Sequence, residues 1–123
     1  MSAHTGRSIE PVWLISKARV VASAGLATSR KDRRRGLLAM TTIAEPLVLD
    51  PCSWVHTIGM KTTIEVAFVA PSGVIIGIDT MKPWRVGPIV RKAKFAIEAS
   101  PGSFERWNIR AGDTIEVRYV DRE

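Results

Sequence analysis

Apolar and polar residues alternate in short runs along this chain, and turn residues separate the runs. The clearest run is Ile64–Val69, in which every second residue is a large apolar one, as in a strand with one deeply buried face. Glu65 falls on the opposite face, where a carboxylate is costly without a partner. Ser72-Gly73 and the apolar run Val74–Ile78 follow at hairpin distance. The pattern therefore predicts a central β-hairpin.

Further short elements flank this hairpin. Extended runs predict one or two strands over Val12–Ala22 and single strands at Leu47–Leu49, Phe95–Glu98 and Thr114–Val120. A short helix is predicted over about Arg30–Leu38, capped by Thr28 or Ser29, and one helical turn carries Phe104 and Trp107. The fold class that follows is α+β and mainly β. We expect a compact antiparallel sheet or a small partly open barrel with one or two short helices.

The length of 123 residues indicates one domain, predicted over residues 12–123 behind a flexible N-terminal tail at 1–11. No window approaches the roughly 18–20 unbroken apolar residues of a membrane span, so we expect no membrane partner. The polar start of the chain does not read as a signal peptide. Cys52 is the single cysteine, which fits a reducing compartment. These features predict a cytoplasmic protein.

The net charge of +6 raises the question of a polyanionic partner, because five of the six residues in Arg30–Arg35 are basic. On a helix, Arg30, Arg33 and Arg34 share one side, whereas Lys31 and Arg35 lie elsewhere. That spread argues against a single stripe reading nucleic acid. We favour a solvated basic helix and keep nucleic-acid binding as the less favoured interpretation.

Several motifs follow one another along the chain: Arg33–Leu38, Val55–Lys61 followed by Glu65, Pro83–Arg85, Ala96–Glu98 followed by Pro101-Gly102, and Ala111–Asp113. Taken in this order, they resemble domain-of-unknown-function family 192. The resemblance covers roughly Val12–Val120 and rests on their order, since no single motif is specific. It implies a small β-rich domain and no established activity.

The ionisable and aromatic residues within these motifs form the candidate site. They are His56, Lys61, Glu65, Trp84, Arg85 and Glu98. One hypothesis is a ligand pocket in which cations hold an anionic or polar ligand, Trp84 forms a stacking wall and His56 donates a hydrogen bond. The two glutamates are expected to meet basic neighbours at a common edge of the sheet. The alternative is a set of structural ion pairs, which would involve Arg33, Arg35 and Asp113.

Catalysis is a second hypothesis, in which His56 acts as a general base oriented by Glu65 or Glu98. Cys52 lies roughly 13 Å from His56 along an extended chain, so the two need a fold-back to meet. No serine elbow, phosphate loop or dinucleotide fingerprint occurs. We expect no metal and no cofactor and assign no catalytic residue. The sequence favours a binding module for a small molecule or a protein, ahead of a small hydrolase-like enzyme and a polyanion binder.

Overall fold

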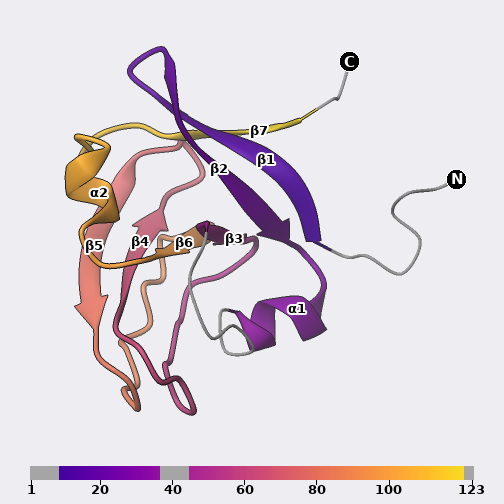
Figure 1. The fold of residues 1–123 in the computed structure, drawn as a ribbon, viewed down its shortest axis with the longest axis vertical. Helices are drawn as coiled ribbons and strands as arrows, with labels where there is room; N and C mark the ends of the chain where they lie inside the picture. The colour runs from indigo at the N-terminus through magenta and orange to yellow at the C-terminus, as the bar shows by residue number, and fades with distance from the viewer. Residues whose placement is uncertain (1–8, 37–44, 121–123) are drawn as a thin grey trace, which may run out of the picture.

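The computed structural model describes residues 9–36 and 45–120. Its elements are β1 (Ile9–Ser16), β2 (Arg19–Ala27), α1 (Arg30–Arg35), β3 (Leu47–Leu49), β4 (Ile64–Val69), β5 (Ile75–Met81), β6 (Phe95–Ala99), α2 (Ser103–Arg106) and β7 (Glu116–Tyr119). The seven strands form one sheet in the order β5-β4-β6-β3-β2-β1-β7. Figure 1 shows α1 in the connection between β2 and β3 and α2 between β6 and β7.

The sheet is mixed and mostly antiparallel. Every neighbouring pair is antiparallel except β2 and β3, which run parallel because the chain crosses over through α1 between them. The sheet is open, although an isolated bridge between Val74 and Thr114 brings the β4–β5 turn to the chain just before β7. The predicted fold class is confirmed, and of the two predicted architectures the chain adopts the sheet.

Two apolar clusters cover the two faces of this sheet, as strand alternation requires. Ala67, Val69 and Ile97 belong to the first cluster, together with Phe104 of α2. Val66 and Phe68 belong to the second, which the chain between β3 and β4 covers through residues such as Val55 and Met60. The central hairpin matches the prediction, and every residue of β4 except Glu65 is buried, so both faces of this strand are covered.

Element boundaries differ from the sequence-based expectations at the N-terminal end. β1 begins at Ile9, so Ile9–Pro11 belong to the sheet rather than to the predicted tail, and residues 1–8 lie outside the described part of the chain. Pro11 has no N–H to donate to the ladder, but its carbonyl accepts a hydrogen bond from the Val120 N–H at 3.2 Å. β2 extends to Ala27, beyond the predicted end at Ala22.

α1 begins where the sequence predicted. The Ser29 hydroxyl caps it by accepting a hydrogen bond from the Asp32 N–H at 3.1 Å. The helix ends at Arg35, and Gly36 follows with a φ of 50°. The remainder of the predicted helix, Leu37 and Leu38, lies outside the described residues.

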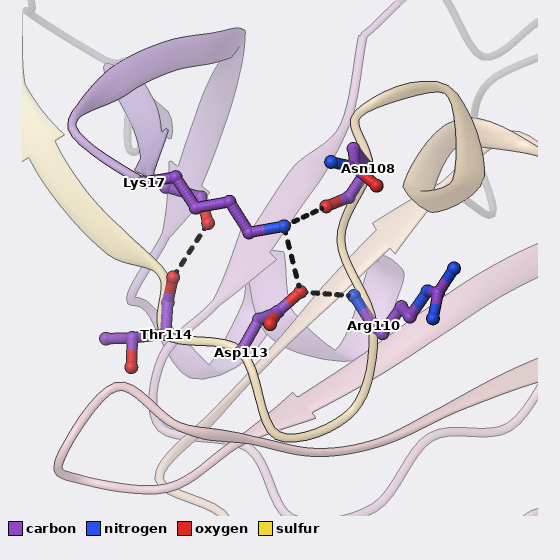
Figure 2. A network of polar contacts seen from close by, with 6 residues as sticks. Lys17, Asn108, Arg110, Asp113 and Thr114 are labelled. Atoms are coloured by element: carbon purple, nitrogen blue, oxygen red, sulfur yellow. Dashed lines mark hydrogen bonds and ion pairs between the residues drawn. The ribbon is translucent and has the colours of Figure 1, made fainter.

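Three turns meet around Lys17 at one end of the sheet. Lys17 and Ala18 both have positive φ and make the two-residue turn that joins β1 to β2. Figure 2 shows the Lys17 ammonium reaching to the Asn108 carbonyl at 2.7 Å and to the Asp113 carboxylate at 3.5 Å. The same carboxylate accepts the Arg110 N–H at 2.8 Å. Asp113, which the sequence placed in a structural ion pair, thus links the β1–β2 turn to the segment that precedes β7.

We expect this network to contribute acid-sensitive stability. The hydrogen bond from the Arg110 backbone, and then the charge of Lys17, lower the pKa of Asp113. A carboxyl whose pKa falls on folding stabilises the protein above its unfolded pKa, and that contribution is lost as the pH falls through the folded pKa. Asp113→Asn should therefore lower the melting temperature near neutral pH and flatten its decline on acidification.

Thermal unfolding of both proteins between neutral and strongly acidic pH checks this. Asp79→Asn, which removes an exposed carboxylate from β5 outside the network, controls for the change in net charge. Parallel melting curves for wild type and Asp113→Asn across the whole pH range would contradict the expectation.

Candidate functional site

A cavity of about 520 Å³ lies between α1, the chain that follows β3, and β6. We call it the α1–β6 cavity. Its size falls in the range of roughly 300–1,000 Å³ that small-molecule sites occupy. Leu49, Val55, Ile58 and Met60 supply much of its apolar lining. Figure 1 shows α1 close to the segment that descends from β3, so the crossover from β2 builds one wall.

Basic side chains make up the α1 wall. Arg30, Arg33 and Arg34 line the cavity together, because residues three and four apart share one face of a helix. Arg33 is fixed in place: its Nε donates to the Thr28 carbonyl at 3.1 Å and its Nη1 to the Pro51 carbonyl at 3.2 Å. A guanidinium has five N–H donors, so these two bonds leave others for a ligand.

Lys94 lines the cavity as well and forms an ion pair with Asp50 at 3.4 Å. It comes from the loop that leads into β6, so its position does not depend on α1. Two independent elements therefore place cations around the same space.

Glu98 of β6 brings a negative charge into the cavity lining. Its side chain is buried, with 4% of its surface exposed. A Cβ on Gly36 would lie 2.9 Å from Glu98 Oε1, so the glycine lets the end of α1 approach the carboxylate closely. Arginine charges near a buried carboxylate offset part of its desolvation cost.

Cys52 sits in the same cavity as a protonated thiol. Its sulfur donates a hydrogen bond to the Trp54 carbonyl at 3.3 Å. Burial raises the pKa of the Cys52 thiol, and the nearby charge of Glu98 raises it further, whereas the Trp54 backbone and Arg33 lower it without cancelling the rise. Because the thiolate is the nucleophile, this cysteine is poorly suited to covalent chemistry.

His56 and Trp54 also line the cavity. Their ring centroids lie 5.3 Å apart, and the Trp54 indole N–H donates to the Gly87 carbonyl at 2.8 Å. His56 Nδ1 accepts the Ile58 N–H at 3.2 Å. A neutral imidazole has one donor and one acceptor nitrogen, so its proton is then on Nε2.

Comparison with known families adds to this geometry. Residues 13–117 match domain-of-unknown-function family 192, DUF192, which is described as "Uncharacterized ACR". The chain belongs to this family. The predicted resemblance is confirmed.

A curated relative is similar to part of the chain. The UPF0127 protein PF1050 of Pyrococcus furiosus is 31% identical over 62 residues, which are 50% of this chain and 53% of that protein. The alignment thus spans about half the length of that curated relative.

Two solved structures share the fold. A protein of unknown function from Novosphingobium aromaticivorans DSM 12444 superposes with a TM-score of 0.72 at 18% identity, covering 88% of this chain and 84% of that one. A candidate transcription regulator from Sinorhizobium meliloti 1021 superposes with a TM-score of 0.71 at 21% identity, covering 89% and 93%. At these identities the likeness shows a shared fold alone.

The structure separates the six candidate site residues of this DUF192 chain. His56 and Glu98 line the α1–β6 cavity, whereas Lys61, Trp84 and Arg85 are exposed and do not line it. Glu65 is on the other face of the sheet, where its carboxylate accepts the Phe104 N–H at 3.2 Å.

The expectation that the two glutamates share one edge site is wrong. Glu65 lies opposite Ala99 in the β4–β6 ladder, and Glu98 lies opposite Val66. Residues opposite each other share a face, so the two carboxylates point to opposite sides of the sheet.

The residues expected in structural ion pairs have different surroundings. Asp113 pairs with Lys17, while the hydrogen bonds of Arg33 go to backbone carbonyls. The side chain of Arg35 lies outside what the structure describes. Among residues 9–36 and 45–120, no three His, Cys, Asp or Glu side chains group in a way that could hold a metal ion. Within the same residues, no helix is long and apolar enough to cross a membrane.

Sequence reasoning missed several cavity residues, namely Arg30, Arg34, Trp54, Met60 and Lys94. The shared helical face of Arg30, Arg33 and Arg34 was visible in the sequence. The sequence did not show that this helical face lies near β6, because that position depends on how β3 pairs with β2 and with β6.

Proposed function

We propose that this DUF192 domain binds a small anionic ligand in the α1–β6 cavity. The observation that carries the proposal is the convergence of Arg30, Arg33 and Arg34 with Lys94 around one partly apolar cavity of about 520 Å³. Arginine is the side chain best suited to carboxylate and phosphate groups because its planar donors bind two oxygens at once. An apolar lining next to these side chains lowers the local dielectric constant and strengthens such contacts.

The rest of the lining indicates the shape of the ligand. Val55, Ile58 and Met60 favour an apolar portion next to the anionic group. The buried carboxylate of Glu98 favours a hydrogen-bond donor or a cationic group elsewhere on the same molecule. The best candidates are therefore amphiphilic carboxylates or phosphates that also carry an amine or hydroxyl.

A hydrolase-like activity has weaker support. A general base needs a free lone pair, and the acceptor nitrogen of His56 is engaged by the Ile58 N–H. The Cys52 thiol has a raised pKa and donates to a backbone carbonyl. Neither residue is arranged as an activated nucleophile or base in this geometry.

Nucleic-acid binding through Arg30–Arg35 also has weaker support, although the Sinorhizobium meliloti neighbour is described as a candidate transcription regulator. Three of these basic residues line the α1–β6 cavity, and Arg33 is held by two backbone carbonyls. That arrangement suits a compact anion better than an extended phosphate backbone, which needs cations along an open surface.

Tryptophan fluorescence offers a direct test, because Trp54 lines the cavity and Trp84 does not. A Trp13→Phe/Trp84→Phe background removes two exposed indoles and makes the signal of Trp54 easier to follow. A panel of small carboxylates, phosphates and their zwitterionic analogues should include members that change the emission and raise the melting temperature. Trp54→Phe should abolish the emission change but keep the thermal stabilisation.

Arginine variants should show how much the basic wall contributes to ligand affinity. Arg30→Gln and Arg34→Gln should each weaken binding of a panel ligand by about 10–100-fold, since a charged hydrogen bond contributes about 1.5–3 kcal/mol. Arg19→Gln, on the β1–β2 hairpin, removes the same charge away from the cavity and should leave the affinity unchanged. Equal affinities for all three variants, or no binding by any panel member, would contradict the proposal.

A further inference from the structure

Two neighbouring loops display apolar and basic side chains together at one end of the molecule. They are residues 54–62, before β4, and residues 82–92, between β5 and β6, and we call them the basic-apolar tip. Figure 1 shows the two narrow loops projecting beyond the sheet, at the end opposite the β1–β2 hairpin. Among the residues that the structure describes, the tip contains Ile58, Trp84, Val86 and Ile89, each exposed over at least 42% of its surface.

Backbone hydrogen bonds hold these two loops in one arrangement. Thr57 is fully buried, its hydroxyl donates to the Lys82 carbonyl at 2.6 Å, and it accepts the Arg85 N–H at 2.8 Å. The Thr57 N–H donates to the Arg85 carbonyl at 2.8 Å, and the Trp84 N–H donates to the Thr57 carbonyl at 2.9 Å. The exposed apolar side chains are therefore presented by an ordered framework, with little left to order on docking.

Trp84 is the most informative residue of the tip. Its φ is 63°, in the left-handed region that non-glycine residues seldom adopt, and 65% of its surface is exposed. Core packing does not compensate for that backbone conformation, because the side chain is mostly outside. Strained residues of this kind concentrate at ligand and partner sites.

The charge of the tip has one sign. Its two loops contain Lys61, Lys82, Arg85, Arg91 and Lys92 and no aspartate or glutamate. All five cations are exposed. A surface with interleaved tryptophan, aliphatic and cationic side chains matches the boundary of an anionic bilayer, where indoles sit at the headgroup level and cations meet acidic lipids.

We propose that the basic-apolar tip docks this protein on an anionic phospholipid surface. The apolar side chains stand on projecting loops rather than in a groove, which suits shallow insertion into a deformable interface better than the capture of a peptide. The proposal replaces the sequence-based expectation of no membrane contact, which considered spanning segments only. Residues 54–62 also border the α1–β6 cavity, and Ile58 belongs to both sites, but the variants that test the tip lie in residues 82–92, which do not line the cavity.

Vesicle co-sedimentation at low salt tests the proposal. The protein should bind vesicles of 30% phosphatidylglycerol and 70% phosphatidylcholine at least about tenfold more tightly than vesicles of phosphatidylcholine alone, and added salt should reverse this. Arg85→Gln should weaken binding by about fivefold, the value expected for one cation near the surface. Trp84→Ser should weaken it by at least about tenfold through lost apolar burial.

The β1–β2 hairpin offers matched controls at the opposite end of the molecule. Arg19→Gln and Val20→Ser mirror Arg85→Gln and Val86→Ser in residue type and exposure. Only the tip variants should lose vesicle binding, and circular dichroism with thermal melting should show all four proteins folded.

Three results would overturn the proposal. One is no sedimentation of the wild type with the anionic vesicles, and another is equal loss from tip and hairpin variants. Binding to polyglutamate without binding to vesicles would assign the tip to an acidic protein partner instead. Loss of vesicle binding in Arg30→Gln or Arg34→Gln, with tip variants unaffected, would place a lipid headgroup in the α1–β6 cavity, so that the cavity proposal survives and the tip proposal fails.

Discussion

Phe104→Ala should lower the free energy of unfolding by about 3–5 kcal/mol, the cost of removing a buried aromatic ring and leaving a cavity. Phe104 is 2% exposed and belongs to the first apolar cluster. Its ring meets Trp107 edge to face, with the centroids 5.1 Å apart, so both α2 and the following turn depend on it. Chemical denaturation followed by circular dichroism measures the loss.

Two further variants serve as controls for the effect of Phe104→Ala. Glu105→Ala, one position along α2 and exposed, should change stability by no more than about 0.5 kcal/mol. Phe104→Leu keeps most of the apolar volume and should fall between the wild type and Phe104→Ala. A loss below about 1 kcal/mol for Phe104→Ala would mean that α2 does not seal this side of the sheet.

Thr57→Val should lower the free energy of unfolding by about 2–5 kcal/mol, because it keeps the shape of the side chain and deletes a hydroxyl that serves two backbone groups. The Lys82 carbonyl and the Arg85 N–H each lose a partner, at about 1–3 kcal/mol per group. Hydrogen exchange at Arg85 should quicken at the same time, since its amide donates to that hydroxyl.

Thr57→Ser is the matched control, since it keeps the hydroxyl and removes one methyl group at about 0.8 kcal/mol. The serine variant should retain slow exchange at Arg85 and most of the stability. Equal stabilities for the valine and serine variants would show that the hydroxyl does not hold the two loops together.

Local patterns in the sequence predicted the strands and helices well. Alternation identified which residues of β4 share a face and the positions of Ala96 and Glu98 on one side of β6, and a capping hydroxyl at Thr28 or Ser29 identified the start of α1. These features depend on neighbours within a few residues. The parallel pairing of β2 with β3 does not, because it joins segments about 20 residues apart through a crossover.

The candidate site depended on pairings of that long-range kind. Glu65 and Glu98 each sit in an apolar strand, but whether they share a face is decided by the register of β4 against β6. A shift of one residue would place both carboxylates on the same side, and no local pattern distinguishes the two registers. His56 was different, because it was chosen from a motif visible in the sequence, and the structure places that residue in the cavity lining.

Trp84 illustrates a different limit. A proline and an arginine beside it suggested an ordered loop, and the loop is ordered. The direction of the indole, however, follows from a positive φ, which the sequence of a non-glycine residue does not announce. Trp84 therefore lies outside the expected pocket, and 65% of its surface is exposed at the tip.

The place of β1 between β2 and β7 has a consequence for biosynthesis. Besides β2, β1 pairs with β7, which is made much later. The Val12–Tyr119 pairing therefore cannot form until the residues of β7 have left the ribosome. At about 5–20 residues per second, the roughly 90 residues between β2 and β7 take about 5–20 s to synthesise. Throughout that interval the nascent hairpin carries an open backbone edge, which makes this stage the one at which a chaperone would protect the chain most.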